Sequence, residues 1–251
     1  MSLTKAEIQK VRALGDKKGR DEFGLFVAEG EKIIREIAAS PMQIDRIYAL
    51  EGVMEDVGGV VRVSRSEMER LSMLKTANNS LATVKIPRYG FDLGSARRNL
   101  VLALDEIGNP GNVGTLIRLA DWFGISDVVC SAGTADCFNP KVVQATMGAI
   151  IRVRVHYTDL ERLLQEAENE NIPVYGTFLD GENIYGADLG GSGFIVMGSE
   201  GRGISDAVAR RVNRRLFIPP YPAGRHGSES LNVSTAAAVV CSEFRRRKNT
   251  F

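Results

Sequence analysis

Hydrophobic and polar positions along the chain predict strands and helices that follow one another throughout its length. In the first ninety residues the pattern predicts helices over 4–18, 29–39 and 64–74, with strands over 23–27, 43–50, 60–63 and 81–86. After residue 100 it predicts strands over 100–104, 127–130, 151–155, 173–178, 194–197 and 216–218, with helices over 113–123, 139–149, 158–170, 204–212 and 232–247. Strands that alternate with helices indicate an α/β fold with a parallel sheet.

A stretch rich in glycine and arginine, Arg88–Asn99, interrupts this pattern. We place the domain boundary there, which predicts a first domain over 1–90, a linker over 91–99 and a second domain over 100–251. A chain of 251 residues fits this division, because domains commonly hold about 100–200 residues. Leu100–Leu104 is apolar at every position, as expected of a strand buried on both faces.

Composition narrows the class of protein. With 44% hydrophobic and 25% charged residues, the chain is of the folded globular type, and neither disordered nor collagen-like. It has no apolar run near the ~18 residues of a membrane span and no apolar signal segment, so we expect no membrane partner. Three cysteines (Cys130, Cys137, Cys241) without metal-ligand spacing predict reduced thiols in a cytoplasmic protein. Two histidines, His156 and His226, are too few for a metal cluster, so no metal is expected.

A net charge of +1 argues against a nucleic-acid partner, because such proteins commonly carry a basic excess. The charge is nevertheless clustered. Six arginines against one acid, Asp206, lie between Arg202 and Arg225, and Arg245–Lys248 adds a second basic run. Such runs are commonly solvated faces, but a planar guanidinium suits phosphate well.

Three unusual segments each follow a predicted strand. The first is Asp105–Gly114, which leads into a helix whose Arg118 lies on the side opposite to the buried Leu116. A salt bridge from Arg118 to Asp121 is the structural alternative to a catalytic role for that arginine.

The second segment, Gly198–Gly203, places three glycines around Glu200, so that its backbone could approach a ligand closely. A simple glycine turn is the alternative. The spacing is not the G-x-G-x-x-G fingerprint, and it comes late in the chain, which argues against a nucleotide-dependent oxidoreductase.

The third segment runs from Ile218 to Ser234 and feeds the last helix. Ser230 and Asn232 could simply cap that helix. All three segments follow strands, however, and ligands of open α/β sheets bind beyond the carboxyl ends of strands.

The three segments together resemble the motifs of the SpoU (TrmH-type) family of RNA ribose 2′-O-methyltransferases, in the SPOUT superfamily. The family's three motifs occur here in the same order, as Asn112…Arg118, as Gly198–Gly203, and as Ile218-Pro219 with Ser230–Ser234. The resemblance covers about Leu100 to Arg247. In the first domain, Phe26–Gly30 resembles the ribosomal-protein-like RNA-binding domain that is often fused to this fold.

The resemblance implies a small α/β RNA-binding domain followed by a catalytic domain with a trefoil knot. It also implies a homodimer that binds S-adenosylmethionine (AdoMet). The family's cofactor contacts map onto Gly198, Ile218 and Leu231. Its positions for catalysis and site organisation map onto Asn112, Arg118, Glu200, Ser230 and Asn232.

The function implied is AdoMet-dependent methylation of a ribose 2′-hydroxyl of structured RNA, with rRNA favoured over tRNA. The loop between Pro219 and Ser230, which holds Arg225 and His226, is longer than in the family pattern. This departure keeps an alternative open, an RNA-binding protein on a degenerate methyltransferase fold. The family assigns the general base to Arg118, but a guanidinium is effectively always protonated, so we prefer a role in holding phosphate and stabilising the alkoxide. With few basic clusters, RNA affinity is expected to depend only modestly on salt.

Overall fold

The computed structural model describes residues 3–222 and 230–247. Its contacts divide the chain into two compact units. Unit 1 comprises the residues up to Arg88 together with Asp136–Ile151, and unit 2 comprises Tyr89–Ala135 with the residues from Arg152 onward. By these contacts Asp136–Ile151 groups with unit 1, although it lies within the second domain predicted over 100–251.

Unit 1 is built on a four-stranded sheet in the order β1-β4-β2-β3. The strands are β1 (Leu25–Glu29), β2 (Ile44–Ala49), β3 (Val60–Arg62) and β4 (Ser80–Lys85). The helices are α1 (Lys5–Ala13), α2 (Lys17–Phe23), α3 (Glu31–Ala38), α4 (Arg65–Leu71) and α7 (Pro140–Ala145), followed by a short 3₁₀ turn, η1 (Ala149–Ile151). β4 runs antiparallel to β1 and β2, whereas β2 and β3 are parallel.

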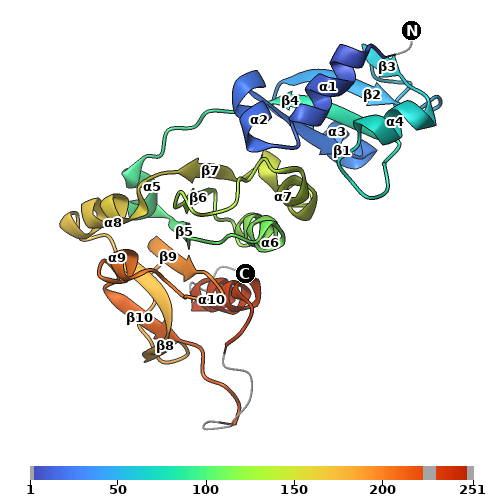
Figure 1. Ribbon diagram of the computed structural model, residues 1–251. Coiled ribbons are helices and arrows are strands. Elements are labelled where there is room, and N and C mark those ends of the chain that lie inside the picture. The colour runs from blue at the N-terminus through green and yellow to red at the C-terminus, as the bar shows by residue number, and fades with distance from the viewer. Residues whose placement is uncertain (1–2, 223–229, 248–251) are drawn as a thin grey trace. The chain divides into compact units, whose positions relative to one another are not determined.

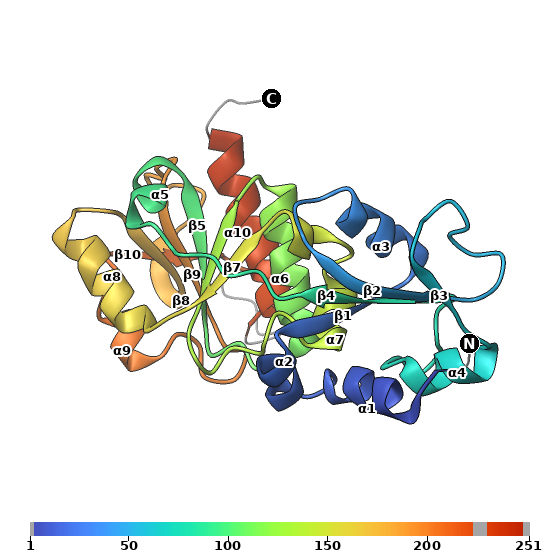
Figure 2. The same ribbon diagram turned by 90° about the horizontal axis from the view of Figure 1, so that it is seen from above.

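Period-two alternation along β1 gives the sheet of unit 1 two apolar faces. Leu25 and Val27 pack with buried residues of α1 and α4, whereas Phe26 and Ala28 pack with those of α3. Figure 2 shows α3 on one side of the sheet and α1 and α4 on the other. Both faces are covered, which explains why β1 is almost wholly apolar.

Unit 2 holds a six-stranded sheet in the order β10-β8-β9-β5-β6-β7, in which every pairing is parallel (Figure 1). The strands are β5 (Leu100–Asp105), β6 (Asp127–Cys130), β7 (Arg154–Tyr157), β8 (Val174–Asn183), β9 (Gly193–Gly198) and β10 (Arg214–Phe217). The helices are α5 (Leu93–Arg98), α6 (Pro110–Trp122), α8 (Leu160–Asn169), α9 (Asp206–Ala209) and α10 (Val233–Arg247). The predicted α/β fold with a parallel sheet is confirmed, and the continuous apolar strand β5 is buried along its whole length.

Three of the differences between predicted and observed elements have a clear local cause. The helix expected over 4–18 is two helices, because the chain turns at Leu14–Asp16 and Gly19 packs so closely on Ala13 that a Cβ would lie 2.1 Å from its carbonyl oxygen. The predicted linker 91–99 contains α5, which begins because the Asp92 side chain accepts a hydrogen bond from the Gly94 amide. The last strand before α8 lies at β7 rather than over 151–155, since Ile151 still belongs to η1.

Candidate active site

The first motif begins α6 three residues earlier than the hydrophobic pattern predicts. Asn109 caps this helix, accepting hydrogen bonds from the backbone amides of Gly111 (2.8 Å) and Asn112 (3.2 Å), and Pro110 occupies the first helical position. Asn112 therefore lies in the first turn of α6, the helix that follows β5.

The second motif is a tight turn after β9. The backbones of Ser199 and Gly203 exchange two hydrogen bonds of 2.9 Å, and Gly203 has a φ of 71°. At Gly198 a Cβ would lie 2.2 Å from the Gly203 carbonyl carbon, so only glycine fits there. The alternative of a glycine turn is thus correct for the backbone, and the same turn presents Glu200 at its tip.

The third motif contains Asn232, whose side-chain oxygen accepts hydrogen bonds from the amides of Ser234 (2.9 Å) and Thr235 (3.3 Å). These bonds cap α10 and determine the orientation of the carboxamide. Because the side-chain oxygen of Asn232 caps α10, its side-chain nitrogen faces the other two motifs.

The three motifs meet through their side chains. Asn112 Nδ2 donates to Glu200 Oε1 at 3.0 Å, and Asn232 Nδ2 donates to Asn112 Oδ1 at 3.2 Å and also to Glu200 Oε1. One carboxylate oxygen therefore accepts from two amides. Capping by Asn232, the alternative to a site role, coexists with this network instead of replacing it.

Asp105, at the end of β5, was not among the candidate residues, but the structure gives it a positioning role. It is 2% exposed, pairs in register with Gly198 across β5 and β9, and accepts a hydrogen bond of 2.7 Å from the Ser205 amide. This bond holds the residue after the Gly198–Ile204 turn against β5. A carboxylate directly after an apolar strand is the sequence signal that could have identified it.

Arg118 lies on the exposed side of α6, as expected, ~9 Å further along the helix than Asn112 at about 1.5 Å per residue. The salt bridge to Asp121, which was the structural alternative to a catalytic role, does not form. Asp121 instead accepts from Arg152, at 2.8 Å at the shortest. Within residues 3–222 and 230–247, Arg118 makes no ion pair, so its guanidinium is available to a ligand.

The remaining predicted residues are less tightly held. Ile218 follows β10 and is partly buried, Leu231 is 48% exposed, and Ser230 is exposed without a hydrogen bond to the part of the chain that the structure describes. Arg225 and His226 lie outside the described residues.

Most of the clustered arginines contact the protein's own acceptors. Arg211 pairs with Glu161 and Glu168, and Arg215 pairs with Asp180. The second run does the same: Arg245 donates to the carbonyls of Phe123 and Gly124, Arg246 to Glu243, and Arg247 to Glu243 and three carbonyls over 184–187. The Arg245–Arg247 run is thus structural.

All three cysteines are buried thiols. Over residues 3–222 and 230–247, no helix has both the length and the apolar character needed to cross a membrane, and no three His, Cys, Asp or Glu side chains are grouped to hold a metal.

Comparison with known proteins places this site in a family. The model of the SpoU rRNA Methylase family matches residues 99–242, and that of an MRM3-like substrate binding domain matches residues 5–82. The chain is 30% identical over 249 residues to the 23S rRNA (guanosine(2553)-2'-O)-methyltransferase RlmP of Bacillus subtilis (strain 168), covering 96% of this chain and 97% of that protein.

Solved structures agree with this relationship. A putative RNA methyltransferase of the TrmH family from Porphyromonas gingivalis superimposes with a TM-score of 0.88 at 37% identity, covering 98% of this chain and 99% of that one. The AdoMet-bound rRNA methyltransferase from Sinorhizobium meliloti superimposes with a TM-score of 0.86 at 27% identity, covering 98% of both chains. The family-model match covers more than half of the chain and includes all three motifs, so this protein belongs to the SpoU rRNA methylase family.

Proposed function

We propose that the protein is an AdoMet-dependent methyltransferase that methylates a ribose 2′-hydroxyl of structured RNA, with rRNA favoured over tRNA. The observation that carries this proposal is the convergence of Asn112, Glu200 and Asn232, one residue from each motif, on shared hydrogen bonds. The B. subtilis relative is named as a 23S rRNA 2′-O-methyltransferase, which supports rRNA as the substrate class.

The residues at the ends of β9 and β10 fit AdoMet. A Cβ at Gly201 would meet no atom within 4 Å, which leaves open space along the turn, and Leu231 offers a half-exposed apolar surface. Gly198, Ile218 and Leu231 would hold the cofactor there. When bound, AdoMet supplies an activated methyl group; the S. meliloti relative is named as an AdoMet-bound rRNA methyltransferase.

The protein's own groups then have to place the ribose oxygen and stabilise the charge that develops on it. Alignment of reacting groups can supply roughly 7–11 kcal/mol of a barrier. Arg118 holds an RNA phosphate, whose oxygen would accept the proton that leaves the 2′-hydroxyl, and stabilises the charge that develops on the ribose oxygen. The hydrogen bonds among Asn112, Glu200 and Asn232 hold three segments together: the first turn of α6, the glycine turn and the start of α10. Ser230 completes the rim of the site.

We extend the proposal to three properties of the family pattern. The first is a trefoil knot in the catalytic domain over 100–251. The second is a homodimer, which is supported by Trp122 at the end of α6, a large aromatic side chain that is 84% exposed. The third is a cytoplasmic location, which the buried thiols suit.

Titration calorimetry with AdoMet tests the proposal against the alternative of an RNA-binding protein on a degenerate fold. Saturable binding supports the enzyme, and its absence favours the alternative. Mapping ribose-methylated positions in total RNA, with and without the gene, then identifies the substrate. An unchanged map would contradict methyl transfer.

A further inference from the structure

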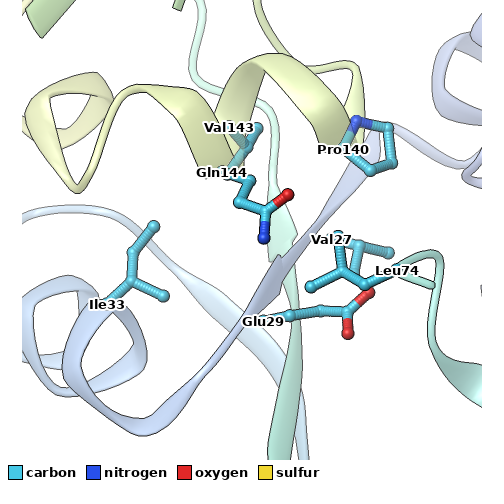
Figure 3. A pocket seen from close by; sticks show the side chains of 7 residues that line it. All are labelled: Val27, Glu29, Ile33, Leu74, Pro140, Val143 and Gln144. Carbon is cyan, nitrogen blue, oxygen red and sulfur yellow. The ribbon is translucent and has the colours of Figure 1, made fainter. Parts of the chain in front are cut away.

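Two cavities in unit 1 are poor candidates for a ligand site. The one beside β1 measures about 20 Å³, enough for about one water molecule (Figure 3). The other, of about 150 Å³, lies between α1 and the strands β2 and β4. Its charged side chains already neutralise one another, Glu7 with Arg46 and Lys10 with Asp45. A free polar side chain is found instead in unit 2, at the carboxyl edge of the sheet.

Glu106, the residue after β5, has a backbone conformation that is unusual for a residue with a side chain. Its φ is 54°, in the left-handed region that favours glycine. Hydrogen bonds to the turn after β6 hold it there: the Glu106 amide donates to Ser131 Oγ (2.8 Å), and the Ala135 amide donates to the Ile107 carbonyl (2.9 Å). Strained residues that the surrounding structure holds in place are concentrated at functional sites, so this conformation indicates that Glu106 has a role beyond the fold.

The side chain of Glu106 is exposed and has no partner among the described residues, where it accepts no hydrogen bond and forms no ion pair. It extends over Gly133, where a Cβ would lie 3.3 Å from Glu106 Cγ. The absence of a side chain at Gly133 leaves this space to the glutamate. Both carboxylate oxygens therefore remain free to accept hydrogen bonds from a ligand.

Glu106 also lies close to the proposed AdoMet site. Its neighbour Asp105 pairs in register with Gly198 across β5 and β9. With ~4.8 Å between paired strands and ~3.8 Å between consecutive Cα atoms, the Cα of Glu106 lies within ~9 Å of that of Gly198. Ligands of open parallel sheets bind at this carboxyl edge. A nucleotide whose ribose oxygen lies at the methyl group of AdoMet can therefore bring its base to Glu106.

We propose that Glu106 reads the base of the methylated nucleotide and selects guanine. A carboxylate only accepts hydrogen bonds, and its two oxygens match two neighbouring donors. Guanine alone among the four bases presents such a pair, N1–H and the 2-amino group, on its Watson–Crick edge. Adenine, cytosine and uracil place an acceptor beside the donor on that edge, and an acceptor opposite a carboxylate is unfavourable. The inference rests on the proposed function for its substrate class and adds the identity of the base.

The test uses the full chain and three fluorescein-labelled single-stranded 12-mers, r(UG)6, r(UI)6 and r(UA)6, with anisotropy as the readout. Inosine differs from guanosine only in lacking the 2-amino group. We expect r(UG)6 to bind about 10-fold more tightly than r(UI)6, because one hydrogen bond to a charged group is lost, and more tightly than r(UA)6. Equal binding of r(UG)6 and r(UI)6 would overturn the proposal.

Glu106→Gln tests the carboxylate directly. A carboxamide has one donor and one acceptor, which match N1 and the amino group of adenine, so the preference should change from r(UG)6 to r(UA)6. Glu106→Gly should remove the preference without lowering the unfolding temperature, because glycine adopts a φ of this sign without strain. Asn171→Gly, at a φ of 56° before β8, relieves a similar strain and should keep the wild-type preference. A guanine preference that both Glu106 variants retain would contradict the proposal.

The two proposals fail separately. Binding of the 12-mers needs no methyl transfer, so a guanine preference that depends on Glu106, found without AdoMet binding, would overturn only the proposed function. If the ribose-methylation map places the methyl group on a nucleotide other than guanosine, only the role of Glu106 is overturned.

Discussion

Asn232 donates a hydrogen bond of 3.2 Å from its side-chain nitrogen to Asn112 Oδ1, although 120 positions separate the two residues. Both amides also donate to Glu200 Oε1. Because the oxygen of Asn232 caps α10, the nitrogen has only one direction available. The helix cap thereby determines the polarity of the whole network.

Asn232→Asp should separate the two roles of this side chain, capping α10 and donating to Asn112 and Glu200. Aspartate caps helices as well as asparagine does, so the unfolding midpoint should stay near that of the wild type. A second carboxylate would face Glu200 without a donor, so kcat/KM should fall by about 10- to 100-fold. Methyl transfer to RNA and thermal unfolding are the two measurements. Asn232→Ala is the comparison, because this variant should lose activity and also about 1 kcal/mol of stability. If Asn232→Asp is as active as the wild type, the hydrogen-bond network is not needed for catalysis.

Arg118→Ala should reduce methyl transfer at least about 100-fold, because a preorganised charge opposite a developing oxyanion is removed. AdoMet affinity, measured by calorimetry, should stay within about twofold, since Arg118 is exposed on α6 and tethered to no described side chain. Arg162→Ala, at an exposed arginine on α8, is the control for loss of a surface cation. Wild-type turnover by Arg118→Ala would rule out both the base and the alkoxide-stabilising role.

Asp105→Ala should weaken both the fold and the site, because it leaves the partly buried Ser205 amide without its acceptor. The expected loss in the free energy of unfolding is about 1–3 kcal/mol. Since the bond holds the turn that carries Gly198 and Glu200, AdoMet affinity should fall as well. Asp105→Asn keeps an acceptor of the same shape and should retain most of the stability and most of the AdoMet affinity. If Asp105→Ala is less stable but binds AdoMet normally, Asp105 contributes to stability and not to the site.

Asp127 should make the stability of unit 2 depend on pH in acid. Burial raises the pKa of Asp127, but hydrogen bonds from Arg154, His156 and Ser95 outweigh it and lower the pKa from 3.8 to about 2. A carboxyl group whose pKa is lower in the folded state stabilises the fold above its unfolded value, and this contribution is lost as the pH falls from about 4 through about 2.

Chemical denaturation of wild type and Asp127→Asn at several pH values measures this contribution. We expect a difference in unfolding free energy on the order of 2 kcal/mol at neutral pH that shrinks toward pH 2. Asp188→Asn supplies a control at a carboxylate outside this network. A difference that does not vary between pH 5 and pH 2 would contradict the assignment.

The linear chain determined the class of fold and the chemistry of the motifs, because both depend on local patterns. Leu100–Leu104 is predicted to be a buried parallel strand because all its positions are apolar. Asn112, Glu200 and Asn232 were assigned to the site through the resemblance of their motifs to those of the SpoU family. Element ends were less predictable. Asn109 and Pro110 begin α6 early, and the chain between α1 and α2 turns where a continuous helical stripe was expected, since caps and close backbone contacts outweigh periodicity there.

Only the tertiary structure decided which polar groups partner one another. Hydrophobic periodicity reports which side of an element is buried, but a hydrogen bond depends on positions a few ångströms apart that distant segments bring together. Hence Asp121 pairs with Arg152 instead of Arg118, Asp105 restrains the glycine turn, and α7 packs in unit 1 despite its place in the sequence of the second domain. The same reason decides the roles of the arginines. Those that reach acceptors within the fold stabilise it. Arg118 reaches no acceptor among the described residues, so its guanidinium is available to bind RNA.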